Sequence, residues 1–466
     1  MPFDQHLPID KPLSIAVIGS GITGMAAAWL LSENHNISVF EKDDRIGGHT
    51  NTVIAKTHVG DIPVDTGFIV YNAPSYPNLV RLFKYLDVPT QESDMSFAVS
   101  LGNGALEYAG TNISSLFAQP SNAFRPRYWR MLKDLVRFYH NAPNTLVDVG
   151  IEDMTLGDYL AQHRYSEAFV DDHLLPMAAA IWSTAADNMR NHSAAGFIRF
   201  FQNHSLFNLT TRPAWRTVSG GSGTYAEILT RAYKDAIHVN AGVAKIMTSP
   251  DASPIIVDNH GNRQEFDRII IATHADQALA LLESPTETER DLLGRFKYAA
   301  NRAILHSDVT QMPKRRKAWS SWNVVSESRR AGHEPVSLTY WMNRLQNLDD
   351  KAPLFVSLNP TRQPPDETIH AAFDYEHPIF TDKTQAARQD LWKLQGQRGL
   401  YYGGSYFGDG FHEDGLQSGL RAAELAGHVV RPWSSPDQNS RISINPKDRT
   451  PEPMLLPTSL TNAGAS

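Results

Sequence analysis

Apolar runs and helical periodicity alternate from the start of the chain. Residues 14–18 form a short, β-rich apolar run that predicts a buried parallel strand. An apolar helical stretch follows over residues 21–33, and a second strand is expected at 37–40. Because the connections are short, this opening predicts a βαβ unit with parallel strands.

The same patterns divide the rest of the chain. Strands around a helix at 76–85 are expected between residues 60 and 101, and residues 112–210 have mainly helical character. The glycine-rich turn Ser219–Gly223 is expected to open a helix where α/β character returns. The remaining strands are predicted at 237–246, 254–258, 268–272, 302–306, 336–341, 354–358 and 399–402, followed by a helix over 415–428.

Three glycines follow the first predicted strand in the pattern Gly19-x-Gly21-x-x-Gly24. The first suits a tight turn, the second lets a pyrophosphate approach backbone N–H groups, and the third lets helix and strand pack closely. Glu41 ends the second strand, where a carboxylate can bind both ribose hydroxyls of an adenosine and repel a 2′-phosphate. These residues predict a dinucleotide site that disfavours NADP. An ordinary glycine turn and a solvated acid are the alternatives.

A second glycine pair follows in Arg45-x-Gly47-Gly48-His49-Thr50. Nicotinamide enzymes need no such pair, whereas flavin enzymes pass the chain here beside the pyrophosphate and flavin. The sequence therefore predicts FAD. Since the chain contains no cysteine, it has no disulfide and no cysteine-linked flavin, and we expect FAD to be bound non-covalently.

Further motifs are scattered over residues 13–430. They are Asp65-Thr66-Gly67-Phe68, Tyr76-Pro77-Asn78, Ser93-Asp94-Met95-Ser96-Phe97, Pro176-Met177, Ile181-Trp182-Ser183, Asn203-His204, Pro213-x-Trp215, Trp319-Ser320-Ser321-Trp322-Asn323 and Gly410-Phe411-His412-Glu413-Asp414-Gly415-Leu416. Together with the glycine motifs they resemble the flavin amine oxidase, phytoene desaturase and protoporphyrinogen oxidase superfamily. Within it the chain is most similar to a subgroup that resembles the flavoprotein domain fused to cyclopropane fatty-acid synthases and the desaturases of methylated fatty acids.

This resemblance implies an α/β fold with a Rossmann-like, glutathione-reductase-like FAD-binding domain, a mixed-sheet substrate domain and a helical subdomain. The FAD-binding domain is expected to be discontinuous, over residues 1–90, 213–290 and 395–430. Residues 91–212 and 291–394 are expected to form the substrate-binding domain. The proline-rich, polar segment 431–466 is expected to be a disordered tail.

The resemblance also implies cofactor-binding residues beyond the glycines and Glu41. Two positions depart from the family pattern: His49 replaces the usual arginine after the glycine pair, and Ser405 replaces the acid that binds the ribityl chain. For Val243, a core position is the alternative to a backbone contact with adenine. The additional residues are Ile22, Thr23, Lys42, Arg45, His49, Thr50, Gly67, Phe68, Val243, Thr273, His274, Ser405, Asp414, Gly415 and Leu416.

The last motif suggests where the chemistry occurs. A helix that begins near Gly415, capped by Asp414, would point its N–H groups at the flavin pyrimidine edge. Phe411, His412 and Trp215 are expected beside the isoalloxazine as catalytic candidates. His412 could accept a proton after hydride loss, or it could simply hydrogen-bond backbone in a tight loop.

The substrate is expected to be a lipid or another apolar small molecule. Aromatic and aliphatic residues in the non-flavin half could form a tunnel for an acyl chain or isoprenoid, or could form the domain core. We expect dehydrogenation or desaturation of an acyl chain by hydride transfer to flavin N5. A flavin amine or amino-acid oxidase, or a non-redox flavoprotein partner of a lipid methyltransferase, remains an alternative. The candidate lining residues are Trp182, Phe197, Phe200, Phe201, Leu206, Phe207, Trp319 and Trp322.

Charge and composition restrict which ligands and partners the chain is expected to bind. The net charge of −7 argues against nucleic-acid binding, and the histidines lack metal-ligand spacing, so no metal is expected. Without a signal peptide or a run of about 18 apolar residues, a cytoplasmic protein is expected. The basic, aromatic stretch 125–139 could seat it peripherally on the inner membrane surface, or form a core helix with a solvated basic face.

Overall fold

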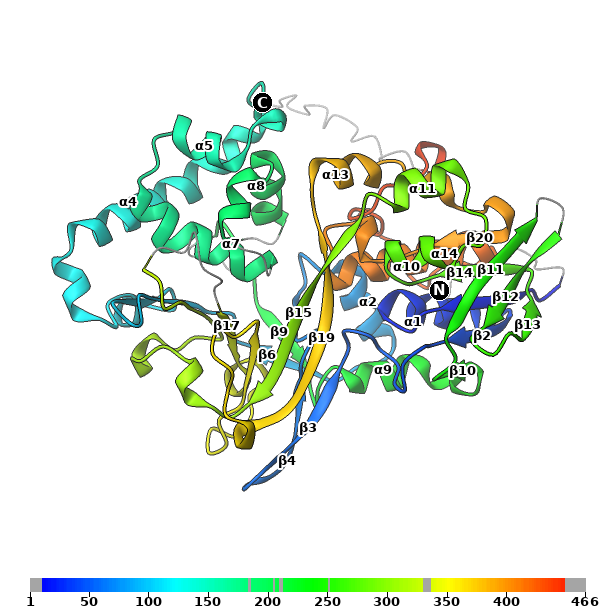
Figure 1. Ribbon diagram of the computed structural model, residues 1–466, viewed down its shortest axis with the longest axis horizontal. Helices are drawn as coiled ribbons and strands as arrows, with labels where there is room; N and C mark the ends of the chain where they lie inside the picture. The colour runs from blue at the N-terminus through cyan, green and yellow to red at the C-terminus, as the bar shows by residue number, and fades with distance from the viewer. Residues whose placement is uncertain are drawn as a thin grey trace, which may run out of the picture.

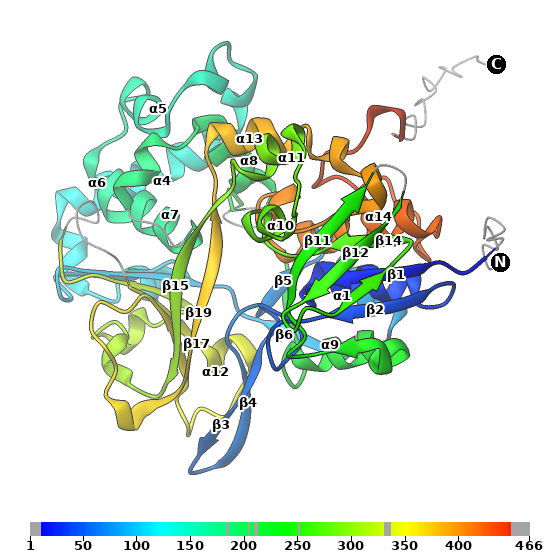
Figure 2. The same cartoon turned by 45° about the vertical axis from the view of Figure 1, so that its right-hand side comes forward.

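The computed structural model describes residues 11–182, 186–203, 206–208, 213–249, 252–329 and 337–448. Helices and sheets are mixed along the described chain, which confirms the predicted α/β class (Figures 1 and 2). The motif residues Ser183 and His204, and the side chain of Trp182, lie outside this description. No helix in the described part is long and apolar enough to cross a membrane.

The first layer is a parallel sheet of five strands in the order β10-β2-β1-β14-β20. Its strands come from three distant parts of the chain. The apolar helix α1 packs between this sheet and α14, which explains why it has almost no polar face. The elements are β1 (Ser14–Ile18), α1 (Ile22–Leu31), β2 (Asn36–Phe40), β10 (Ile237–His238), β14 (Arg268–Ile271), β20 (Leu400–Tyr402) and α14 (His412–Gly427).

The predicted single strand over 237–246 is wrong. The chain turns at Asn240, which has a left-handed φ of 53°. The turn separates β10 from β11, which joins a separate three-stranded antiparallel sheet. The elements here are β11 (Val243–Ser249), β12 (Ala252–Asp258), β13 (Arg263–Glu265), α10 (Ala275–Leu281) and α11 (Glu287–Leu293).

The second layer is a seven-stranded sheet in the order β19-β15-β18-β17-β16-β7-β8. Its long antiparallel pair, β15 and β19, runs alongside the half that contains the parallel sheet in both views (Figures 1 and 2). The elements are β7 (Phe97–Leu101), β8 (Leu106–Ala109), β15 (Lys297–His306), β16 (Trp322–Val325), β17 (Ser337–Trp341), α12 (Met342–Gln346), β18 (Phe355–Leu358), β19 (Ile369–Ile379) and α13 (Asp382–Arg388).

A lobe of helices covers the end of this sheet, as the helical character of residues 112–210 predicts (Figure 1). Its core is strongly aromatic, with Phe138 and Phe201 fully buried. The helices are α3 (Ile113–Leu116), α4 (Pro126–Asn141), α5 (Leu156–Gln162), α6 (Glu167–Phe169), α7 (Leu175–Trp182) and α8 (Ala194–Asn203).

Short elements join the two halves. The fully buried Asp65 accepts hydrogen bonds from the backbone N–H and hydroxyl of Ser222, both at 2.8 Å, in the glycine-rich turn. Burial raises the pKa of the Asp65 carboxyl to about 6. This contact fixes the turn that opens α9, as predicted. The elements are β3 (Thr52–Thr57), β4 (Gly60–Asp65), β5 (Val70–Asn72), α2 (Pro77–Tyr85), β6 (Thr90–Ser93), β9 (Trp215–Val218) and α9 (Gly223–Thr230).

The predicted disorder from residue 431 onward is wrong for residues 431–448. Arg431 is buried and donates to Glu424 at 2.6 Å. Arg441 donates to Asp414 on the first turn of α14 at 2.9 Å. These charge-assisted bonds hold a segment that is too polar to pack by apolar burial alone. The remaining predicted tail, 449–466, lies outside the described residues.

Candidate active site

A cavity of about 1810 Å³ extends from the parallel sheet to the helical lobe. At one end its lining includes Gly19 and Glu41, which follow β1 and β2. At the other end it includes Leu132 of α4 and Phe200 of α8. The loops after β1 and β2 and an apolar compartment therefore share one space.

The three glycines after β1 have distinct geometric roles. Gly19 has φ +96°, and a Cβ there would lie 2.7 Å from the Ala272 carbonyl oxygen. A Cβ on Gly24 would lie 1.9 Å from the Gly19 carbonyl oxygen, so this glycine permits close packing of helix and strand. A Cβ on Gly21 would meet nothing within 4 Å. Only Gly21 therefore leaves open space at the start of α1, where a pyrophosphate fits.

Glu41 is buried at the end of β2. Its Oε2 accepts hydrogen bonds from the backbone N–H and hydroxyl of Ser20, and its Oε1 accepts from the Asp43 N–H at 3.0 Å. The carboxylate thus braces the glycine turn and also lines the cavity. A carboxylate oxygen can accept more than one hydrogen bond, so this arrangement still suits a ribose.

The second glycine segment passes directly beside this turn. Gly47 and Gly48 have φ of +102° and +57°, and the Gly47 N–H donates to the Ser20 carbonyl oxygen at 3.0 Å. The His49 ring, next in sequence, stacks on Tyr375 with centroids 4.8 Å apart. His49 Nε2 is buried without a hydrogen-bond partner, and burial lowers the pKa of His49 well below its usual value. A neutral imidazole with an unsatisfied nitrogen fits a wall that contacts a polar ligand.

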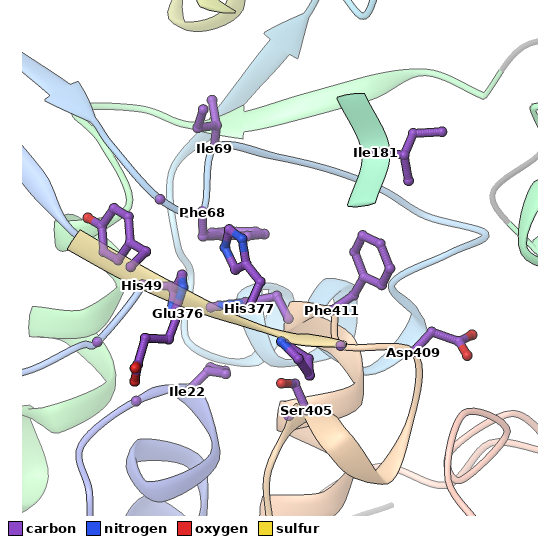
Figure 3. A pocket seen from close by; sticks show the side chains of 18 of the residues that line it. Ile22, His49, Phe68, Ile69, Ile181, Glu376, His377, Ser405, Asp409 and Phe411 are labelled. Carbon is purple, nitrogen blue, oxygen red and sulfur yellow. The ribbon is translucent and has the colours of Figure 1, made fainter. Parts of the chain in front are cut away.

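Strand β19 supplies cavity residues that sequence motifs did not reveal. Tyr375, Glu376 and His377 all line the cavity, and β19 crosses between Ile22 and Phe411 in Figure 3. Glu376 lies 3.4 Å from Nδ1 of His274. Burial lowers the pKa of His377 to about 4. These residues belong to no recognisable motif. Their place at the cavity follows only from the pairing of β19 with β15.

The predicted start of the last helix requires correction. The helix α14 begins at His412, and Asp414 lies inside its first turn instead of capping it. The Asp414 carboxylate accepts the N–H groups of Asp409 and Phe411, each at 2.8 Å, and pairs with Arg441. Asp414 is therefore satisfied within the protein and does not line the cavity.

His412 lines the cavity at the start of this helix. Its Nε2 lies 2.6 Å from the hydroxyl of Tyr225, which also contacts the Thr50 hydroxyl. Burial lowers the pKa of His412 to about 3. The imidazole is therefore neutral near pH 7 and a poor proton acceptor. The structure favours the alternative in which His412 is held in a hydrogen-bonded chain.

Phe411 and Trp215 also line the cavity. The Phe411 ring lies 5.2 Å from Phe200 of the helical lobe, and in Figure 3 it points toward Ile181. It therefore stands where the glycine-rich end of the cavity meets the apolar compartment. Trp215 begins β9.

We call that compartment the apolar arm. Two of its polar side chains contact each other: the Tyr108 hydroxyl lies 2.9 Å from Nδ1 of His173, and burial lowers the pKa of His173 to about 4. Among the described residues that line it, none carries a carboxylate, ammonium or guanidinium group. Its lining residues are Phe97, Tyr108, Leu116, Leu132, Leu135, Val136, Tyr139, His173, Met177, Ala180, Ile181, Phe200, Leu206, Trp215 and Trp322.

Most of the predicted site residues meet in this one cavity, and a few do not. Gly24, Thr50, Asp414 and Leu416 are not part of its lining. Of the apolar lining candidates, Phe197 and Phe201 are buried in the lobe core, and Trp319 packs against Trp341. The predicted residues that do line it are Gly19, Gly21, Ile22, Thr23, Glu41, Lys42, Arg45, Gly47, Gly48, His49, Gly67, Phe68, Val243, Thr273, His274, Ser405, Gly415, Phe411, His412 and Trp215.

Solved structures share this fold. The chain resembles cyclohexylamine oxidase from Brevibacterium oxydans IH-35A with a TM-score of 0.63 and 15% identity, covering 90% of this chain and 99% of that one. It resembles a fatty acid isomerase from P. acnes with a TM-score of 0.61 and 16% identity, over the same shares of the two chains. At these identities the likeness concerns the fold.

Sequence comparisons identify the family of the chain. Flavin-containing amine oxidase A from Equus caballus is 24% identical over 263 residues, which cover 53% of this chain and 47% of that protein. The chain thus spans about half the length of this curated relative. The family of flavin containing amine oxidoreductases matches residues 22–426, nearly the whole described chain. With its glycine loops, Glu41 and His49 placed around one cavity, the chain belongs to the flavin containing amine oxidoreductase family, whose cofactor is FAD.

Proposed function

We propose that this FAD-dependent oxidoreductase dehydrogenates an apolar acyl chain that lies in the apolar arm. The observation that carries the proposal is the uncharged lining of the arm, which continues into the cofactor end of the cavity. An apolar chain gains free energy from leaving water for such a compartment, about 0.8 kcal/mol for each buried CH₂ group. A charged substrate would lose hydration without gaining a partner there.

When bound, FAD would supply two-electron oxidation: a substrate carbon would give up a hydride, the neighbouring carbon would lose a proton to water, and a carbon–carbon double bond would remain. The residues of the chain bind and orient the reactants. Gly21 and Glu41 would hold the pyrophosphate and ribose, and Phe411 would position the chain at the junction with the arm. His412 is neutral and bonded to Tyr225, so we assign it no proton-accepting role.

Since an unactivated methylene is a poor hydride donor, we expect an activated position, such as one allylic to an existing double bond. Dioxygen or a quinone would then reoxidise the cofactor. The fold also occurs in a fatty acid isomerase, which supports an acyl chain as a substrate class for this architecture.

An amine oxidase is the second candidate, because the sequence relatives and several structural neighbours are amine oxidases. Aromatic walls can also accept a neutral amine. The two candidates differ in the substrate that reduces the flavin.

The test is anaerobic mixing of the purified yellow protein with candidate substrates, with loss of flavin absorbance as the readout. We expect reduction by detergent-dispersed lipids with unsaturated acyl chains and none by putrescine or cyclohexylamine. Reduction by the amines alone would overturn the proposal. Movement of a double bond without net flavin reduction would indicate an isomerase instead.

Placing a charged side chain in the arm tests its role, and the same substitution at an exposed position is the matched control. Ile181→Glu should raise the KM for the acyl substrate by about tenfold or more while FAD stays bound, since Ile181 lines the arm away from the glycine loops. Ile379→Glu introduces the same change at an exposed position at the end of β19 and should leave the KM unchanged.

A further inference from the structure

The outer end of the helical lobe carries large apolar side chains in water. Ile113 and Phe124 are 79% and 87% exposed, and Trp129 is 51% exposed. The Trp129 indole N–H donates to the Ala123 carbonyl oxygen at 2.8 Å, and its ring lies 5.7 Å from that of Phe117. These contacts join α3, the turn before α4, and α4 into one surface, which we call the α3–α4 patch. Exposed patches of this kind usually mark an interaction site.

Helical spacing extends the patch along α4. Val136 lies seven residues after Trp129, on the same face, and is 53% exposed. Lys133 lies between them on this face and is exposed, as is Arg130 beside it. Aromatic and aliphatic groups with flanking cations are the composition of a helix that lies on an anionic membrane surface.

The charges of α4 are divided between its faces. Its one acidic residue, Asp134, is buried and accepts the Ser166 N–H at 2.8 Å. Arg137, in the basic stretch 125–139, pairs with Asp134 at 3.0 Å and covers the Tyr165 ring. Arg130 and Lys133 are therefore the cations that α4 presents beside the patch, and no acidic side chain of this helix opposes them.

The patch is continuous with the apolar arm. Val136 belongs both to the exposed surface and to the lining of the cavity. Leu116 on α3 and Leu132 on α4 line the same part of the arm and are partly exposed. The wall of the arm therefore reaches the surface at residues of α3 and α4. In Figure 1, α4 lies at the outer edge of the helical lobe, away from α1.

We propose that the α3–α4 patch docks on an anionic bilayer, and that the acyl chain of a membrane lipid enters the arm between α3 and α4 while its head group stays outside. This rests on the proposed function for the identity of the substrate, whereas the docking itself does not. The uncharged arm explains why a head group would remain at the surface, beside Arg130 and Lys133. A protein partner would explain the exposed patch but not its continuity with an uncharged cavity.

Docking is tested by flotation of the FAD-loaded full chain with phosphatidylcholine vesicles, with and without phosphatidylglycerol, at low and high salt. We expect the wild type to float with the phosphatidylglycerol vesicles at low salt, and less at high salt. Ile113→Asp combined with Phe124→Asp should reduce the bound fraction by about tenfold, as should Arg130→Glu combined with Lys133→Glu. Ile54→Asp, at an exposed position of β3, is the matched control and should float like the wild type.

Entry is tested by comparing two presentations of the same lipid. Ile113 and Phe124 do not line the cavity. In the double variant, detergent-dispersed lipid should therefore reduce the flavin at the wild-type rate. The same lipid presented in vesicles should no longer reduce it. Flotation of the double variant equal to the wild type would overturn the proposal. A wild type that does not float with anionic vesicles would also overturn it. This includes the case in which the patch binds another protein instead. If no lipid in either form reduces the flavin while flotation depends on the patch, the proposed function fails and the docking stands.

Discussion

The imidazole of His412 lies flat against the ring of Phe68, with centroids 3.9 Å apart and planes inclined by 10°. The two residues come from distant parts of the chain, and both line the cavity. With Tyr225 holding Nε2, the stack fixes the imidazole as a neutral ring in the wall. The histidine at the start of α14 therefore acts by shape and hydrogen bonding, a role that its residue type alone does not indicate.

We predict that His412→Gln keeps its FAD and slows substrate-dependent flavin reduction by less than about tenfold, since glutamine can still bond Tyr225 and no proton is accepted at this position. Stopped-flow reduction across pH 5–9 provides the measurement. A loss of about 100-fold or more, together with loss of an ionisation in the pH profile, would restore His412 as the general base. Tyr225→Phe, which removes the hydroxyl that holds the ring, should have a similarly small effect.

The cofactor end of the site was predictable because its signals are local. The glycine pattern and Glu41 lie within one βαβ unit, where strand, turn and helix follow one another along the chain. The role of Tyr375, Glu376 and His377 depends on the pairing of β19 with β15 and on how that pair lies beside the glycine loops. The arm is harder still, because a run of aromatics looks the same whether it forms a core, as Phe201 does, or lines a cavity, as Phe200 does.

Substitutions at two glycines of the first motif should affect different properties, FAD binding at one position and folding at the other. Gly21→Ala should fold normally, because its Cβ meets nothing within 4 Å and its φ of −64° is ordinary. The added methyl group would occupy the space for the pyrophosphate and weaken FAD binding by about tenfold or more, equivalent to about 1.4 kcal/mol. Gly24→Ala would place a methyl group 1.9 Å from a carbonyl oxygen and should destabilise the apoprotein itself.

Thermal unfolding of the two apoproteins and titration with FAD distinguish these effects. Equal loss of stability in both variants would show that Gly21 is also a packing glycine.

Glu41→Ala should weaken FAD binding, since a buried carboxylate that we propose to bond the ribose would be lost, and each such charge-assisted bond contributes about 1.5–3 kcal/mol. Some of the loss would come from the turn, because Glu41 also accepts hydrogen bonds from Ser20. Retained FAD after dialysis is the measurement. Glu33→Ala, at an exposed acid just after α1, is the control and should retain FAD. If the Glu41 variant retained all its FAD, Glu41 would have only a structural role.

The buried histidines predict how stability depends on pH. Burial lowers the pKa of His173 and His377 to about 4 and that of His412 to about 3. In the unfolded chain these groups take up protons near pH 6.5, so below that pH the unfolded state binds more protons than the folded state. The contribution of these histidines to stability is therefore complete above about pH 6.5 and falls as the pH drops toward the folded-state values, by about 1.4 kcal/mol per pH unit for each such histidine.

Urea unfolding of the apoprotein at pH 7, 6 and 5 should show this slope. His173→Gln should reduce the slope of the unfolding free energy against pH by the contribution of one histidine, because glutamine can occupy the arm near Tyr108 without titrating. His58→Gln, at an exposed position, is the matched surface control. A wild-type stability that is flat between pH 7 and pH 5 would contradict the neutral state assigned to these imidazoles, and with it the argument that His412 is too weak a base to accept the substrate proton.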